Sequence, residues 1–218
     1  MTIKSGNAAD FSQGSIALKE SFLALRERFI WIAKCWATYR AFYESGSKTD
    51  DVMRRSAPWF FHDFNLIIID YLILEICKVT DRSVTMGREN LTVENLWDQL
   101  NAVGMIQNGA SEIRSSYECV KNYKDFIKDA RNRLVAHFDK ETVLKGEGLG
   151  GHDADEVYVF FDNLEIFSDC VGRLVGAGPQ SFKWGSPGPG DALDLLKVLK
   201  RGLANNEKFE VEGAEVRS

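Results

Sequence analysis

The sequence predicts an all-α protein, a helical bundle of four long helices plus short additional helices. Apolar residues recur at helical spacing through several long segments of the chain. Only four of the 218 residues are prolines, so few positions interrupt a helix. The most β-prone run, "VYVFF" at residues 157–161, continues into helical spacing and therefore does not predict a strand. Long helices without strands are expected to pack as a bundle.

The first half of the chain is expected to form two long helices and a short one. Helical spacing covers residues 15–44, where "SGSKTD" ends it. Pro58 suits the first turn of a second long helix over residues 59–81, which is apolar on nearly all sides, as in a central helix. After a polar loop, Thr92 is expected to cap a short helix that ends near Gly104.

The second half is expected to alternate helices with glycine-rich connections. The predicted segments are a long helix over residues 111–137, a loop over 140–155, a long helix over 156–176, a linker over 177–190 and a short amphipathic helix over 191–204. We therefore expect one helical domain over residues 1–176, with 1–11 flexible. Residues 177–218 would follow it as a Gly/Pro-containing arm with a short C-terminal helix.

Composition and charge limit where in the cell the protein is expected to act and how it can bind an anionic ligand. The net charge is −5, so an anionic ligand must bind a local basic surface and not the overall charge of the protein. The four cysteines are far apart, which is typical of free thiols in a reducing compartment. No apolar signal segment is visible, and the most apolar run, residues 65–76, is too short to span a bilayer. We expect a cytoplasmic protein with no membrane partner.

The segment "KDARNRLVAHFDK", residues 128–140, carries the candidate site. With about 100° between successive residues, His137 lies in the apolar arc of its helix, with Arg131 and Arg133 at the two edges. Residues 121–145 contain seven Lys or Arg against four Asp or Glu, which favours an anionic ligand. A solvated lysine face and a core histidine are the simpler interpretation of the same residues. Three lysines lie in line with Arg131: Lys121, Lys124 and Lys128.

Other motifs support no site. "GEGLGG", residues 146–151, matches G-x-G-x-x-G, but a dinucleotide site needs a strand before it, and here a helix is predicted there. The pairs His62–Asp63 and His152–Asp153 are too few for a metal phosphohydrolase, because the chain has only three histidines. We therefore expect no metal and no cofactor.

The order of residue types in the basic segment resembles a family signature. Arg131, the polar Asn132 and then His137 resemble the R-x(4–6)-H signature of the HEPN superfamily, which prefers Asn, Asp or His directly after the arginine. The motif also closes a long helix just before a loop. Upstream, "IIIDYLILEICKVTDRS" followed by "NLTVENLWDQL" is similar to the AbiU-type branch, where an apolar helix ends in a D-R/P-S-like loop before a short helix. The resemblance covers about residues 15–175.

The resemblance implies a function and a partner. HEPN domains are helical bundles that usually dimerise, with two R–H motifs in one cleft, and active members are metal-independent endoribonucleases, often toxins or phage-defence effectors. The AbiU-type branch is associated with abortive infection. For this chain, the resemblance implies a homodimer that cleaves RNA with Arg131, Asn132 and His137, with an antitoxin or regulatory protein as a further partner. The RNA-binding candidates are Lys121, Lys124, Lys128 and Arg133.

The chemistry of these residue types is suitable. A histidine near neutral pKa can accept or donate a proton, and an arginine fork can hold two phosphate oxygens while it stays charged. Inactive HEPN members act as binding modules. A non-catalytic helical module that binds RNA, nucleotide or a protein partner is therefore the alternative.

Overall fold

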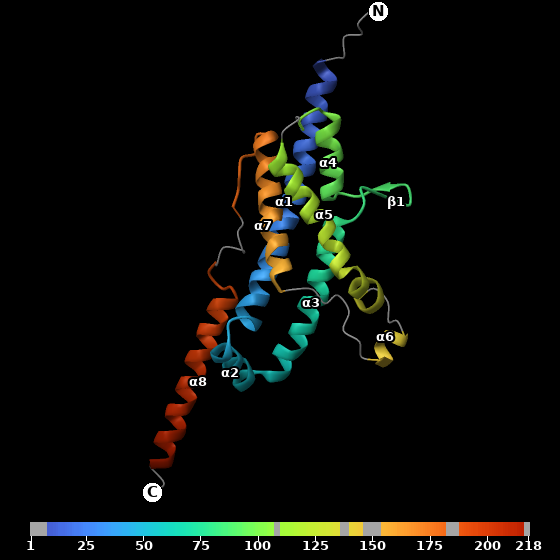
Figure 1. Ribbon diagram of the computed structural model, residues 1–218. Coiled ribbons are helices and arrows are strands. Elements are labelled where there is room, and N and C mark those ends of the chain that lie inside the picture. The colour runs from blue at the N-terminus through green and yellow to red at the C-terminus, as the bar shows by residue number, and fades with distance from the viewer. Residues whose placement is uncertain (1–7, 107–109, 136–139, 146–153, 182–187, 216–218) are drawn as a thin grey trace, which may run out of the picture. The chain divides into compact units, whose positions relative to one another are not determined.

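The computed structural model describes residues 8–106, 110–135, 140–145, 154–181 and 188–215, and these residues are mostly helical (Figure 1). Within them, the strands are two short segments of one hairpin. The prediction of an all-α helical bundle is therefore confirmed. No helix among the described residues is both long enough and apolar enough to cross a membrane.

The predicted long helices are all present. In chain order the elements are α1 (Ala8–Tyr43), α2 (Ser47–Ser56), α3 (Pro58–Thr80), β1 (Val84–Thr85), β2 (Arg88–Glu89), α4 (Val93–Ala102), α5 (Ser111–Ala130), the π-helix η1 (Arg131–Val135), α6 (Lys140–Lys145), α7 (Ala154–Leu174) and α8 (Ala192–Glu215). The predicted cap of the short helix α4 is confirmed, because Thr92 Oγ1 accepts a hydrogen bond of 3.1 Å from the Asn95 N–H. Gly104, with φ 69°, follows the end of α4.

Four elements were not predicted, and each lacks a clear sequence signal. α2 begins after Gly46 without a side-chain cap, so no capping residue marks its start within "SGSKTD". The two strands are too short to show the alternation of polar and apolar residues that identifies a strand. α6 is a short helix at the start of the segment expected to be a loop. α1 also begins earlier, at Ala8, and α8 continues to Glu215, well past the predicted end.

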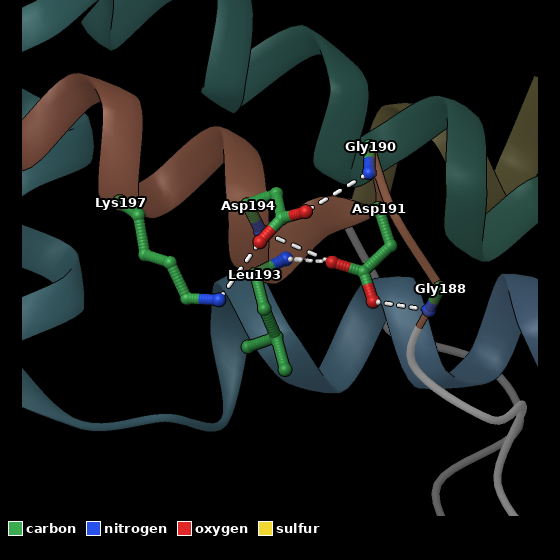
Figure 2. A network of polar contacts seen from close by, with 6 residues as sticks. All are labelled: Gly188, Gly190, Asp191, Leu193, Asp194 and Lys197. Atoms are coloured by element: carbon green, nitrogen blue, oxygen red, sulfur yellow. Dashed lines mark hydrogen bonds and ion pairs between the residues drawn. The ribbon is translucent and has the colours of Figure 1, made fainter.

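The start of α8 is set by a polar network of its own residues (Figure 2). Asp191 Oδ1 accepts hydrogen bonds from the backbone N–H groups of Leu193, at 2.9 Å, and Asp194, at 3.0 Å. The Asp194 carboxylate accepts in turn from the Gly190 N–H, at 3.0 Å, and from Lys197 Nζ, at 2.8 Å. These contacts satisfy amides that the first turn of a helix leaves unpaired, so Asp191 acts as the N-cap.

The chain forms two compact units from segments that are distant in sequence. One unit comprises Met1–Ala33 and Ile73–Lys183, and the other comprises Lys34–Leu72 and Trp184–Ser218. α1 and α3 each pass from one unit to the other. The basic segment around Arg131 belongs entirely to the first unit.

The core of the first unit holds α5 against α7. Tyr123 stacks on Phe160 with ring centroids 4.5 Å apart, and the ring centroids of Tyr117 and Phe167 are 6.2 Å apart. The order of these pairs shows that the two helices run antiparallel. Phe160 and Phe167 are fully buried, and truncation of such a side chain to alanine typically costs about 3–5 kcal/mol. This packing positions the C-terminal half of α5, where the candidate site begins.

Cations of α1 hold the chain that follows α7. Arg26 Nη1 donates a 3.4 Å hydrogen bond to the Ala177 carbonyl, and Lys19 Nζ donates one of 3.3 Å to the Gly176 carbonyl. Gly172 permits this close approach, because a Cβ at that position would lie 2.4 Å from the Gly178 carbonyl oxygen. These basic side chains therefore serve the fold.

The second unit has a small core of its own. Its buried residues are Phe42, Val52, Met53, Phe61 and Leu196. The Tyr43 hydroxyl donates a 2.7 Å hydrogen bond to the Phe61 carbonyl. Trp59 and Ile67, near the start of α3, are exposed. The expectation of a central helix, apolar on nearly all sides, was therefore wrong for the N-terminal part of α3. Apolar composition shows that a face can be buried, but it does not show which partner covers that face.

Candidate functional site

Arg131 marks a change in helix type. α5 ends at Ala130, and residues Arg131–Val135 form the π-helix η1. Short π-helical segments are rare and frequently occur at functional sites. The constant angle per residue used to place His137 relative to Arg131 does not apply through this segment. His137 itself lies outside the described residues.

The Arg131 guanidinium is oriented by its neighbour. Arg131 Nη1 donates a 2.7 Å hydrogen bond to Asn132 Oδ1, and both side chains are half-buried. Arg131 Nε is buried and has no hydrogen-bond partner among the described residues. A buried, unsatisfied donor in a native structure needs an explanation, and a ligand that binds there is one. The contact favours an orienting role for Asn132 over direct binding of phosphate.

The end of α3 lies within electrostatic reach of Arg131. Burial raises the pKa of the Cys77 thiol, and the nearby Arg131 and Lys124 cations partly offset that increase, while Asp81 adds to it. Tyr123 is buried beside the same group, and burial raises the pKa of its hydroxyl. Arg131 and Lys124 therefore form a positive region next to α3.

Lys121 is engaged by a carboxylate that the sequence did not single out. Its Nζ lies 2.7 Å from Glu94 Oε1 of α4 and 5.5 Å from the centroid of the Tyr117 ring. Glu94 Oε2 accepts a 2.7 Å hydrogen bond from the Ser83 N–H. The hydrogen bond from Lys121 holds the pKa of the Glu94 carboxyl below its ordinary value of 4.5, with a further contribution from Ser83. The sequence shows that Glu94 is an acidic residue in the first turn of a predicted helix, but it does not show that Lys121 of α5 is its partner.

The other predicted cations differ in their surroundings. Lys124 is half-buried, Lys128 is exposed, and neither forms a hydrogen bond or ion pair with another described residue. Arg133, in η1, is half-buried and has an interaction within the chain. Phe126 is 45% exposed, whereas Ile127 and Ala130 are buried, so the buried face of α5 leads up to Arg131.

The remaining motifs bring no further site together. His62 is exposed on α3, where it packs edge-on against Trp59, with ring centroids 6.4 Å apart. His152, Asp153 and the glycine-rich segment 146–151 lie outside the described residues. Across the part of the chain that the structure describes, no three His, Cys, Asp or Glu side chains are placed to hold a metal ion.

The described part of the site can therefore bind an anion. Arg131 provides an oriented guanidinium, and Lys124 and Lys128 add positive charge along the same face of α5. A planar guanidinium is suited to a bidentate contact with phosphate. A proton-transfer group would have to come from His137, which is not among the described residues.

The comparisons with known proteins identify a family. No curated protein and no solved structure was found to match the chain. The model of the HEPN family AbiU2 matches residues 15–198, which include the complete Arg131–Asn132–His137 motif. This match extends into α8, beyond the end near residue 175 that the motifs indicated. Because most of the sequence is matched, the chain belongs to the AbiU2 family of HEPN proteins, which is linked to abortive infection.

Proposed function

We propose that the protein is a metal-independent endoribonuclease of the HEPN type, acting in phage defence or a toxin–antitoxin system. Cleavage would take place in a composite Arg/His site between two copies of the chain. The observation that carries this proposal is the environment of the Arg131 guanidinium. It is oriented by Asn132, its buried Nε lacks a partner among the described residues, and it acts together with Lys124 on the Cys77 thiol.

The reaction needs proton transfer and charge stabilisation. The 2′-oxygen of a ribose loses its proton, attacks the adjacent phosphorus and forms a 2′,3′-cyclic phosphate, while the bond from phosphorus to the 5′-oxygen breaks and that oxygen takes a proton. His137 is assigned proton transfer. Arg131 is assigned the charge on the phosphoryl oxygens. One His cannot be both acid and base in a single step, so two subunits that face each other would supply the pair.

The first experiment tests chemistry. RNA incubated with the protein in excess EDTA should still be cleaved and should carry 2′,3′-cyclic phosphate ends. His137→Ala should lower the rate by about 100- to 10,000-fold, which is typical for loss of a proton-transfer group, without changing the melting temperature. Activity that disappears with EDTA and returns with manganese would contradict the proposal.

The second experiment tests assembly. Sedimentation should show a two-fold homodimer, since self-complementary association is the common route to a shared site. Adding an excess of His137→Ala chains to wild-type chains should then lower cleavage by more than dilution, because a mixed dimer holds a single His137 and lacks the acid–base pair. A monomer at tens of micromolar would count against the composite site.

The second candidate is a non-catalytic module that binds RNA, nucleotide or a protein. The net charge of −5 favours it, as does the neutralisation of Lys121 by Glu94. Overexpression separates the two, because an active ribonuclease should arrest growth and His137→Ala should not. Equal growth of the two strains, together with RNA binding by both proteins, would support the module.

A further inference from the structure

The hairpin β1–β2 is an exposed arm beside the basic segment. It projects from the connection between α3 and α4 (Figure 1), and every residue from Val84 to Glu89 is exposed. Met86 and Gly87 form its turn, both with positive φ, and the Met86 side chain is 98% exposed. A methionine at positive φ is uncommon, because L side chains rarely adopt that conformation. The hairpin therefore has no packing partner of its own within the described residues.

Hydrogen bonds hold this arm where a small isolated hairpin would be marginally stable. Asn90 Nδ2 donates to the Arg82 carbonyl, at 3.0 Å, and to Thr85 Oγ1, at 2.8 Å, and the Asn90 N–H donates to the Ser83 carbonyl, at 2.7 Å. These contacts close the base of the arm without an apolar core.

The base of the arm is connected to the basic segment. Glu94 accepts a hydrogen bond from the Ser83 N–H and pairs with Lys121 Nζ, each at 2.7 Å. Asp81, directly before Arg82, and Arg131 both act on the pKa of the Cys77 thiol, the first raising it and the second lowering it. Arg82 therefore lies in the chain between Asp81 and Ser83, and Ser83 is connected to Lys121 of α5 through Glu94.

Two arginines, one in the arm and one at its base, lack partners among the described residues. Arg82 and Arg88 are exposed, and neither guanidinium forms a hydrogen bond or ion pair among the described residues. We propose that the hairpin is a second contact for RNA, in which Arg82 and Arg88 bind phosphates of the strand whose scissile phosphate lies at Arg131. This inference rests on the proposed function. An RNA strand that runs from Arg131 along Lys128, Lys124 and Lys121 would next meet the arm, because Glu94 connects Lys121 to Ser83 at the base of the arm. Contact with the arm would therefore lengthen the segment of RNA that is bound.

Binding of single-stranded RNA to the His137→Ala protein tests the arm without cleavage. Arg82→Ala/Arg88→Ala should weaken binding about tenfold and reduce the slope of log K against log salt by about 1.4, which corresponds to two phosphate contacts. Arg82→Lys/Arg88→Lys should keep the slope. Lys200→Ala/Arg201→Ala is the matched control, since it removes the same charge from exposed positions of α8 and should change neither quantity.

The outcomes distinguish this inference from the function on which it rests. If the wild-type protein cleaves RNA in EDTA and the hairpin variant binds RNA as the control does, the arm is not an RNA contact and the ribonuclease stands. If the wild-type protein neither cleaves nor binds RNA, both proposals fail. A hairpin variant that binds RNA normally but no longer binds a cognate antitoxin would make the arm a protein-docking element and overturn the inference.

Discussion

The two ends of α5 carry opposite charge and use it differently. Near its start, Glu112 borders a cavity of about 390 Å³, called here the acidic pocket, with a lining that otherwise comes from α7: Asp162, Glu165, Ile166, Asp169, Cys170 and Arg173. Towards its end lie the basic residues that continue into η1: Lys121, Lys124, Lys128, Arg131 and Arg133. Both groups belong to the first unit.

The carboxylates of the acidic pocket are largely engaged by the chain itself. Glu165 accepts a 2.7 Å hydrogen bond from the Ser181 hydroxyl, and Asp169 accepts one of 3.1 Å from the Gln180 N–H. The Cys170 thiol donates to Glu112 at 3.6 Å. Two of these contacts hold the segment that follows α7. The acidic pocket is therefore explained by the fold.

The cations at the other end are less engaged. Lys121 is neutralised by Glu94, but Lys124 and Lys128 have no ion pair within the described residues, and Arg131 is bound by a neutral amide. For this reason the proposed RNA surface is placed at the cations of α5 and η1 and not at the acidic pocket. Removal of basic side chains at the end of α5 should weaken RNA binding and cleavage, and removal of an acidic side chain of the acidic pocket should change neither.

The largest effect is expected at Arg131. Arg131→Ala should lower RNA cleavage by about 100- to 1,000-fold, because the phosphoryl charge loses its stabilising donor. Arg131→Lys should recover little, since an ammonium cannot replace the planar fork. The matched change in the acidic pocket, Asp162→Asn, should leave cleavage unchanged. Cleavage assays beside thermal melts measure this, and full activity of Arg131→Lys would make the arginine a structural residue.

A smaller effect is expected for the free lysines. Lys124→Ala/Lys128→Ala should weaken binding of single-stranded RNA and reduce the salt slope by about 1.4, as for the loss of two phosphate contacts. The comparison is again Lys200→Ala/Arg201→Ala, titrated with the same RNA at several salt concentrations. Equal slopes in the two variants would mean that the lysine face is only solvated.

Arg133→Ala should reduce cleavage less than Arg131→Ala. Arg133 lies outside the matched motif position and already has an interaction within the chain. Single-turnover cleavage rates of the two variants, measured with one RNA at saturating protein, provide the comparison. Loss of activity in Arg133→Ala with retention in Arg131→Lys would show that the catalytic arginine was assigned incorrectly.

The smallest effect concerns stability at acidic pH. The pKa of Glu94 is lowered in the folded protein, so the stabilisation by its ionised form is present above pH 4.5 and is lost as pH falls through the lower folded pKa. Glu94→Gln should cost on the order of 1 kcal/mol near pH 7, and the difference from wild type should shrink below pH 4.5. Denaturant melts from pH 3 to 7 measure it, and a difference that grows in acid would contradict the assignment.

Local features of the fold were available from the sequence. Apolar spacing identified the long helices, and Pro58, Thr92 and Gly104 marked helix ends that the structure confirms. These signals are readable because helix formation and capping depend on residues within about one turn of each other. The order of Arg131, Asn132 and His137, with the helices before them, also led to the family that the family model confirms.

The partners of these residues were decided by the tertiary structure. No spacing rule connects Lys121 with Glu94, Arg131 with Cys77, or α8 with α2. The same lysine pattern is consistent with an RNA surface or a solvated face until packing shows which cations have carboxylates beside them. Charges on separate helices interact through space, so their pairing depends on how the helices pack and not on their separation in the sequence.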